Sequence, residues 1–426
     1  MIKIRQNPLC SSISPRHWIY KSLTIQRDLD DMTRDEGLRP GLLSLHTANP
    51  RSQLFEDEWV GDDIGAWSRL DLDNSKNVLV GLTIQSCGLS KIPALFCMSF
   101  PDLKTLWLSN NGIRKLPPEI GLLASLETLS LGQNLLTALP ESISCLRCLK
   151  RLEVPSNLLR ELPRFVSSLN ELEWLDFSEN KLEEVSPESL QGLSASLTRL
   201  DLHSNELHSV PPELFRLTNM KQLSLHSNKL TDLPEELGEA RALSWLSLNC
   251  NCLHRLPDSI GMLTNLARLG VHINELAVIP ATIGNLGKLE ALSLFKNKLT
   301  HLPAELGKLT GLPRLSLYEN NISELPAQMG NMAGLLELWL NSNQLTSVPE
   351  ELGKLRSLRK LWLDYNHITH LPEGLFHDLH SLQELYLDNN QLRQLPADIS
   401  CLTQLRVLSL DGNPVDFNQK TVCTPH

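Results

Sequence analysis

Residues 335–357 read LLELWLNSNQLTSVPEELGKLRS, and this stretch is one copy of a unit that recurs along most of the chain. Its frame is L-x-x-L-x-L-x-x-N-x-L, set by Leu335, Leu338, Leu340, Asn343 and Leu345. Fifteen units share the frame; Cys87 holds the asparagine position in the first. The other fourteen have asparagine at 111, 134, 157, 180, 205, 228, 251, 274, 297, 320, 343, 366, 390 and 413. Eleven of the fourteen spacings are 23 residues, and such a constant period indicates a solenoid.

Each part of the unit predicts a local structure. The alternation around Leu338 and Leu340 is that of a short strand with one buried face. The sharp turn after it leaves backbone groups without sheet partners, which a carboxamide such as Asn343 can both donate to and accept from. The following L-P-x-x-[IL]-G-x-L predicts a short helix on the convex side, beginning near Pro349 and ending near Gly353.

A single unit cannot bury its leucines, so neighbouring units must cover one another. The frame is the leucine-rich repeat signature. We therefore predict an α/β horseshoe solenoid of about fifteen repeats, with a parallel concave sheet and short convex helices. The side chains that point out of the concave sheet are not needed to pack the core, so we expect the functional residues to be among them.

The full consensus, seen in LEALSLFKNKLTHLPAELGKLTG at 289–311, resembles the intracellular Ras-group leucine-rich repeat proteins. This group includes Ras-suppressor and scribble-type scaffolds and the plant intracellular Ras-group proteins. The resemblance covers about residues 79–413. It implies protein–protein scaffolding, with a small GTPase or a phosphatase as possible partner classes. No R/K-V-x-F phosphatase-docking motif is present.

Four regions are expected along the chain. Residues 1–50 lack the frame and are predicted to be a disordered segment; an organelle transit peptide is the alternative, because the first acid is Asp28. Residues 51–78 resemble a plant-type N-terminal cap through Trp59 and Trp67. The repeats occupy 79–413, and 414–426 form a C-terminal cap and tail.

Composition narrows the environment and the partners. The net charge of −10 disfavours nucleic acid and anionic membranes, and no apolar run is long enough to span a bilayer. Nine cysteines, an odd number, favour a reducing compartment, and we expect a cytoplasmic protein. Cys145 and Cys148 are interpreted as buried packing residues. No cofactor or metal is expected, and the oligomeric state is left open.

Outward positions on the strands supply the candidate site. Aromatic residues off the buried frame are typical of interface hot spots. Toward the C-terminal end the candidates are Phe295, Tyr318, Trp339, Trp362, Tyr365 and Tyr386, beside the acids Asp364, Asp388 and Asp411. In the N-terminal half, Arg151, Trp174, Arg199, Trp245 and Arg268 share a column in which arginine can stack on tryptophan. Glu153, Asp176 and Asp201 would pair with these arginines, and His203, His226 and His272 share a further column, expected to be a plain polar surface.

These features favour a non-catalytic interaction scaffold that binds a partner protein on the concave face in intracellular signalling. The alternative is a recognition module that binds a small molecule or glycan on the aromatic residues. Catalysis is disfavoured because the sequence contains no G-x-x-x-x-G-K-[ST], H-E-x-x-H or G-x-S-x-G motif.

Overall fold

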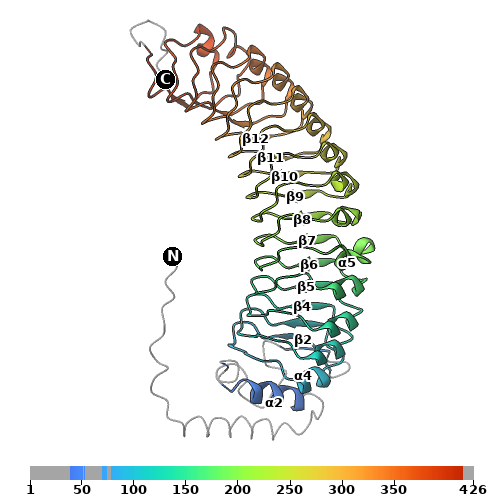
Figure 1. Ribbon diagram of the computed structural model, residues 1–426. Helices are drawn as coiled ribbons and strands as arrows, with labels where there is room; N and C mark the ends of the chain where they lie inside the picture. Colours follow the sequence, from blue (N-terminus) through green and yellow to red (C-terminus); the bar gives the residue numbers. More distant parts are fainter. Residues whose placement is uncertain (1–38, 51, 53–69, 74–77, 416–426) are drawn as a thin grey trace, which may run out of the picture. The chain divides into compact units, whose positions relative to one another are not determined.

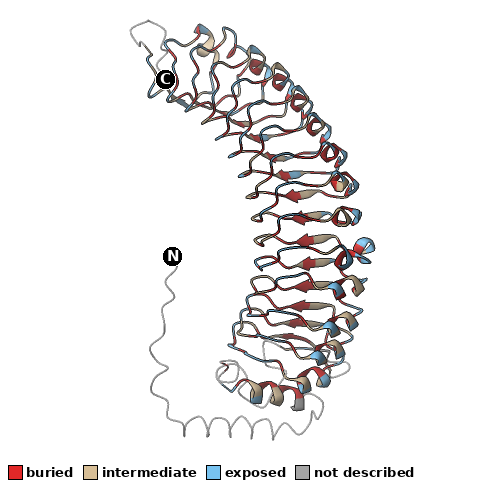
Figure 2. Cartoon of the chain, viewed as in Figure 1, coloured by how far each residue is buried: buried red, intermediate tan, exposed pale blue. Residues whose placement is uncertain are grey.

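The computed structural model describes residues 39–50, 52, 70–73 and 78–415. It divides the chain into two compact units, Met1–Leu159 and Arg160–His426. In Figure 1 the labelled strands of each unit lie side by side along one face, and the short helices follow the opposite face. Buried residues fill the layer between these faces (Figure 2). This confirms the predicted solenoid of stacked repeats.

In unit 1 the strands follow the chain order. Strand β1 pairs antiparallel with β2, and β2 to β5 are parallel. Its strands are β1 (Leu70–Asp73), β2 (Val78–Thr83), β3 (Thr105–Trp107), β4 (Thr128–Ser130) and β5 (Arg151–Glu153). Its helices are α2 (Arg39–Ala48), α4 (Ala94–Ser99) and the 3-10 helices η3 (Pro118–Leu122) and η4 (Glu141–Cys145).

In unit 2 the parallel strands also follow the chain order, and equivalent residues of successive repeats face each other, as Trp339 and Trp362 do. The strands are β6 (Trp174–Asp176), β7 (Arg199–Asp201), β8 (Gln222–Ser224), β9 (Trp245–Ser247), β10 (Arg268–Gly270), β11 (Ala291–Ser293), β12 (Arg314–Ser316), β13 (Glu337–Trp339), β14 (Lys360–Trp362), β15 (Glu384–Tyr386) and β16 (Val407–Ser409). The helices are η5 (Arg164–Ser168), α5 (Pro187–Leu190), η6 (Leu193–Ala195), η7 (Pro212–Arg216), η8 (Glu235–Glu239), η9 (Asp258–Met262), η10 (Ala281–Asn285), η11 (Ala304–Lys308), η12 (Ala327–Asn331), η13 (Glu350–Lys354) and η14 (Ala397–Cys401).

The frame asparagines form the predicted ladder. Asn320, 5% exposed, donates from its side-chain nitrogen to the carbonyl oxygens of Leu294 and Leu317 at 3.1 and 3.0 Å. Its side-chain oxygen accepts from the backbone N–H of Leu299 at 3.1 Å. Each such carboxamide therefore forms hydrogen bonds with backbone groups of its own turn and of the preceding repeat, and so connects the two repeats.

The helical segments differ from the expected ones in two respects. Most are 3-10 helices, and Pro349 is the extended residue before η13 instead of its first turn. Gly353 lies one residue before the end of η13, as the sequence predicts. Glycine is needed at this position because the backbone of the next repeat approaches too closely for a side chain. A Cβ added at Gly261 in η9 would lie 2.6 Å from the carbonyl oxygen of Thr282. Gly238 and Gly353 meet the next repeat in the same way.

The N-terminal part contains an element that the sequence did not predict. Helix α2 lies in the segment expected to be disordered up to residue 50, and it packs on α4 with Leu42 and Leu45 buried. Asn49 extends this contact, since its side chain donates to the carbonyl oxygen of Lys91 at 2.8 Å. Residues 1–38, with the possible transit peptide, and both Trp59 and Trp67 of the expected cap lie outside the described residues.

The residue just before each frame position adopts a left-handed backbone. Its φ lies between 51° and 58° in the fourteen repeats from Cys87 to Asn390, and it is 73° at Gly412, before Asn413. Asn110 and Asn389 suit this conformation, but Ile273 is β-branched, which is unfavourable there. Ile273 is also 42% exposed, so its side chain gains little from burial.

We expect Ile273→Asn to raise the free energy of unfolding by about 1 kcal/mol, because it relieves a non-glycine left-handed strain. Denaturant unfolding would measure the change. Ile273→Val is the matched control, since it keeps the β-branch and should bring no gain. A lower unfolding midpoint for Ile273→Asn would show instead that the isoleucine side chain stabilises the fold.

Candidate functional site

Three outward positions of each repeat form columns along the sheet surface. The first column precedes the first strand leucine, the middle column lies between the two strand leucines, and the third column follows the second. Trp174, Arg199, Trp245 and Arg268 stand in the first column, Trp339, Trp362 and Tyr386 in the middle column, and Phe295, Tyr318, Asp364 and Asp388 in the third column. The parallel register places each residue beside its equivalent in the next repeat.

The C-terminal aromatic residues form two ladders instead of one cluster. In the middle column, the ring centroids of Trp339 and Trp362 are 5.1 Å apart, and those of Trp362 and Tyr386 are 5.6 Å apart. In the third column, Phe295 and Tyr318 stack at 4.3 Å. Side chains two residues apart on a strand share a face without sharing a column, which divides the expected cluster.

Two residues change the expected membership of these ladders. His272 begins the third-column ladder, with its ring 4.2 Å from that of Phe295. His272 was predicted to lie on a plain polar surface, although the 23-residue spacing to Phe295 indicates that the two are neighbours. Tyr365 joins neither ladder, because it is the left-handed residue of its turn and is 58% exposed.

The arginine–tryptophan arrangement forms where the sequence predicts it in β6 and β7. The guanidinium carbon of Arg199 lies 4.1 Å from the centroid of the Trp174 ring. The same guanidinium lies 3.7 Å from a carboxylate oxygen of Asp201, which is buried. Arg268 faces Trp245 in the register but is exposed, with no ion pair in the described part of the chain. In unit 1, Arg151 lies 5.2 Å over Trp107 and pairs with Glu153.

The acidic column differs because its carboxylates lack cations. No ion pair of Asp364, Asp388 or Asp411 occurs among the described residues. Asp388 accepts hydrogen bonds from the Ser409 hydroxyl and from the Asp411 backbone N–H. One oxygen of Asp364 is buried without a hydrogen bond. Burial, and then the charge of Asp388, raises the pKa of Asp364.

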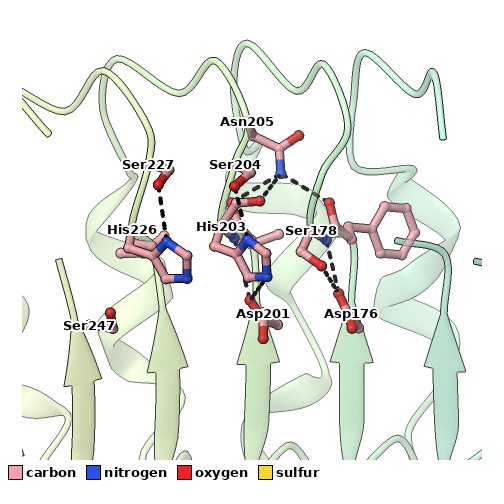
Figure 3. Close-up of polar contacts among 12 residues, drawn as sticks. Asp176, Ser178, Asp201, His203, Ser204, Asn205, His226, Ser227 and Ser247 are labelled. Carbon is pink, nitrogen blue, oxygen red and sulfur yellow. Dashed lines mark hydrogen bonds and ion pairs between the residues drawn. The ribbon is translucent and has the colours of Figure 1, made fainter. Parts of the chain in front are cut away.

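His203 and His226 stack face to face in the third column, with ring centroids 4.3 Å apart (Figure 3). Each Nδ1 lies near the hydroxyl of the next residue, at 3.1 Å to Ser204 and 3.2 Å to Ser227. Burial lowers the pKa of His226, and the neighbouring His203 lowers it further, while Asp201 opposes them. Parallel stacking thus places two basic rings where protonating both is unfavourable.

This geometry predicts an acid-sensitive contribution to stability. The pKa of His226 is lower in the folded protein than in the unfolded chain, so the unfolded state binds more protons as the pH falls through about 6.5. When the pH is lowered from about 7.5 to about 5, we expect the unfolding midpoint of the wild type to fall more than that of His226→Gln. His208→Gln removes an exposed histidine of the preceding repeat and should behave like the wild type. Equal slopes for all three proteins would contradict the prediction.

Other candidate chemistry is limited. Within the described ranges, no group of three or more His, Cys, Asp and Glu side chains is placed to hold a metal ion, and no helix is long and apolar enough to cross a membrane. The interpretation of Cys145 and Cys148 as buried was wrong, because both are exposed on the helical side. They lie at the end of η4 and after it, where side chains point away from the core.

Comparisons with known proteins agree with the repeat geometry. The family model described as leucine rich repeat matches residues 310–368 and 356–415, and the one described as leucine-rich repeat region matches 74–210 and 195–315. No curated protein matches the chain. Among solved structures, a leucine-rich repeat protein of Leptospira interrogans is 34% identical, with a TM-score of 0.66, over 82% of this chain and 93% of that one.

Two further solved structures are also similar. PEPR1, solved with AtPEP1, is 28% identical, with a TM-score of 0.75, over 89% of this chain and 55% of that one. The Arabidopsis receptor kinase HAESA, solved with the peptide hormone IDA and the co-receptor SERK1, is 25% identical, with a TM-score of 0.53, over 92% and 74% of the two chains. With its repeats matched from residue 74 to residue 415, the chain belongs to the leucine-rich repeat family.

Proposed function

We propose that this protein is a non-catalytic scaffold that binds a partner protein on the sheet face of unit 2. The observation that carries the proposal is the ladder of Trp339, Trp362 and Tyr386, whose rings are only partly buried on a face that has no other packing role. Partly exposed aromatic rings supply large contact areas at interfaces. The complex of HAESA with the peptide hormone IDA supports a polypeptide as the ligand.

The cellular role follows from the resemblance to the Ras-group proteins. We place the protein in intracellular signalling in the cytoplasm, with a small GTPase or a phosphatase as the class of partner. Free thiols among the described residues are those of Cys97, Cys145, Cys148, Cys250, Cys252 and Cys401, and they suit a reducing compartment. The alternative is a small molecule or glycan on the same rings, since stacked aromatic faces also bind flat or cyclic ligands.

Affinity capture from the source lysate tests the proposal. We expect Trp339→Ala/Trp362→Ala to lose the partner while keeping the free energy of unfolding within about 1 kcal/mol of wild type, because both rings lie outside the core. Mass spectrometry of the captured proteins would identify what is lost. The matched control is Leu122→Ala/Met262→Ala, which removes two exposed apolar side chains from the helical side.

Capture of the same proteins by the wild type and both double variants would exclude the aromatic ladder as the protein-binding site. If a partner is lost only from the Trp339→Ala/Trp362→Ala protein, the protein-binding role stands. Loss of binding to an added glycan or small molecule, with protein capture unchanged, would favour the alternative.

A further inference from the structure

The chain itself shows how this sheet surface holds an arginine. Trp174 and Arg199 are register neighbours in β6 and β7, and the guanidinium stacks 4.1 Å from the ring centroid. Asp201, two residues after Arg199 on the same strand, lies 3.7 Å from the guanidinium. The arrangement has three parts: an aromatic residue in one repeat, an arginine beside it in the next repeat, and an acid two residues further.

The same three positions recur at the C-terminal end of unit 2, one column along. Tyr386 in β15 is the aromatic residue, its register neighbour in β16 is Ser409, and Asp411 follows two residues later. One side of the Tyr386 ring stacks on Trp362. No ring and no cation of the described residues stacks on Tyr386 from the Ser409 side. Serine thus stands where the earlier arrangement has arginine, so on this side of Tyr386 the described residues supply a ring and an acid but no cation.

The charge around Tyr386 favours a positively charged occupant. First-column acids nearby are balanced by the chain's own cations, since Lys360 lies 3.1 Å from Glu384 and Arg314 lies 3.9 Å from Glu337. The third-column acids Asp364, Asp388 and Asp411 have no such ion pair among the described residues. Burial and the charge of Asp388 raise the pKa of Asp364, so an added cation would relieve a repulsion that the free protein carries.

We propose that the Tyr386 site receives an arginine side chain of the partner protein, with the guanidinium stacked on the Tyr386 ring and paired with Asp388 and Asp411. This deepens the proposed function and rests on it, because it names the chemistry of the partner on the same face. Arginine fits better than lysine, since its planar guanidinium stacks on rings and can pair with two carboxylate oxygens at once.

A small probe tests the site without the partner. The chain has four tyrosines, so the full-length protein labelled with 3-fluorotyrosine gives at most four fluorine signals, which Tyr→Phe variants assign. On titration with N-acetyl-arginine amide, we expect a saturating shift of the Tyr386 signal and little change at Tyr318. N-acetyl-citrulline amide has nearly the same shape without the charge. It should bind at least about tenfold more weakly, as expected for loss of a charge-assisted contact.

Variants then decide between this site and general attraction to an acidic surface. Ser409→Arg supplies the missing cation and should abolish the shift of the Tyr386 signal. Ser293→Arg adds the same charge to the middle column four repeats before Tyr386 and should leave the shift unchanged. Asp411→Asn, at an exposed position, should weaken the probe by about tenfold. An unmoved Tyr386 signal, equal binding of the citrulline probe, or equal effects of the two added arginines would overturn the proposal.

Failure here is separable from failure of the scaffold role. If Ser409→Arg keeps the lysate partner while Trp339→Ala/Trp362→Ala loses it, the face binds protein but not through an arginine at Tyr386. If both variants lose the same partner and Ser293→Arg keeps it, the arginine site is part of the interface.

Discussion

Asn320→Ala is expected to lower the free energy of unfolding by about 3–5 kcal/mol, because several buried backbone groups lose their partner at once. The Asn320 carboxamide serves Leu294, Leu317 and Leu299 at distances from 3.0 to 3.1 Å. These groups lie inside the turn, where water cannot easily replace the carboxamide. Denaturant unfolding of the purified protein would measure the loss.

The neighbouring asparagine provides a matched control. Asn321 is exposed, and only its backbone N–H is used, donating to the Leu299 carbonyl at 2.9 Å. Asn321→Ala keeps that bond and should change the free energy of unfolding by less than about 0.5 kcal/mol. Similar losses for the two variants would mean that the ladder contributes little to stability.

The second large effect is expected at a glycine of the helical face. Gly261→Ala places a methyl group 2.6 Å from the carbonyl oxygen of Thr282, a contact that only a shift of backbone can relieve. Overpacking of this kind costs about 1–3 kcal/mol, and we expect the upper part of that range because the obstacle is main chain. Thermal and denaturant unfolding would both report it.

Gly287→Ala is the control, since a Cβ there meets nothing within 4 Å. It should leave stability unchanged or raise it slightly, because alanine restricts the unfolded chain. A Gly261→Ala protein as stable as the Gly287→Ala protein would show that neighbouring repeats can separate at the 3-10 helices without cost.

The repeat frame made the fold predictable, because each frame residue has one physical role that recurs. The leucines such as Leu338 are buried, and asparagines such as Asn343 satisfy the turn. The 3-10 form of the helices was not predictable from Pro349 and Gly353 alone. It depends on how closely the next repeat approaches, which is a property of the stack and not of one unit.

The site was predictable only as a set of outward positions. Sequence spacing correctly placed Trp174 beside Arg199, because both stand at the same position of adjacent units. It did not separate Trp362 from Tyr318, since it grouped aromatic residues by region instead of by column. It also missed helix α2, which has no repeat frame and is defined by its packing on α4.

The constant register of unit 2 spaces equivalent side chains of its sheet face at equal intervals. Adjacent strands are about 4.8 Å apart, so positions such as Trp339 and Tyr386 are separated by whole numbers of that step. Insertion or deletion of one 23-residue unit between two contact points would move them by one step and leave every side chain facing the same way. The spacing of side chains along this surface and their chemistry can therefore change independently of each other.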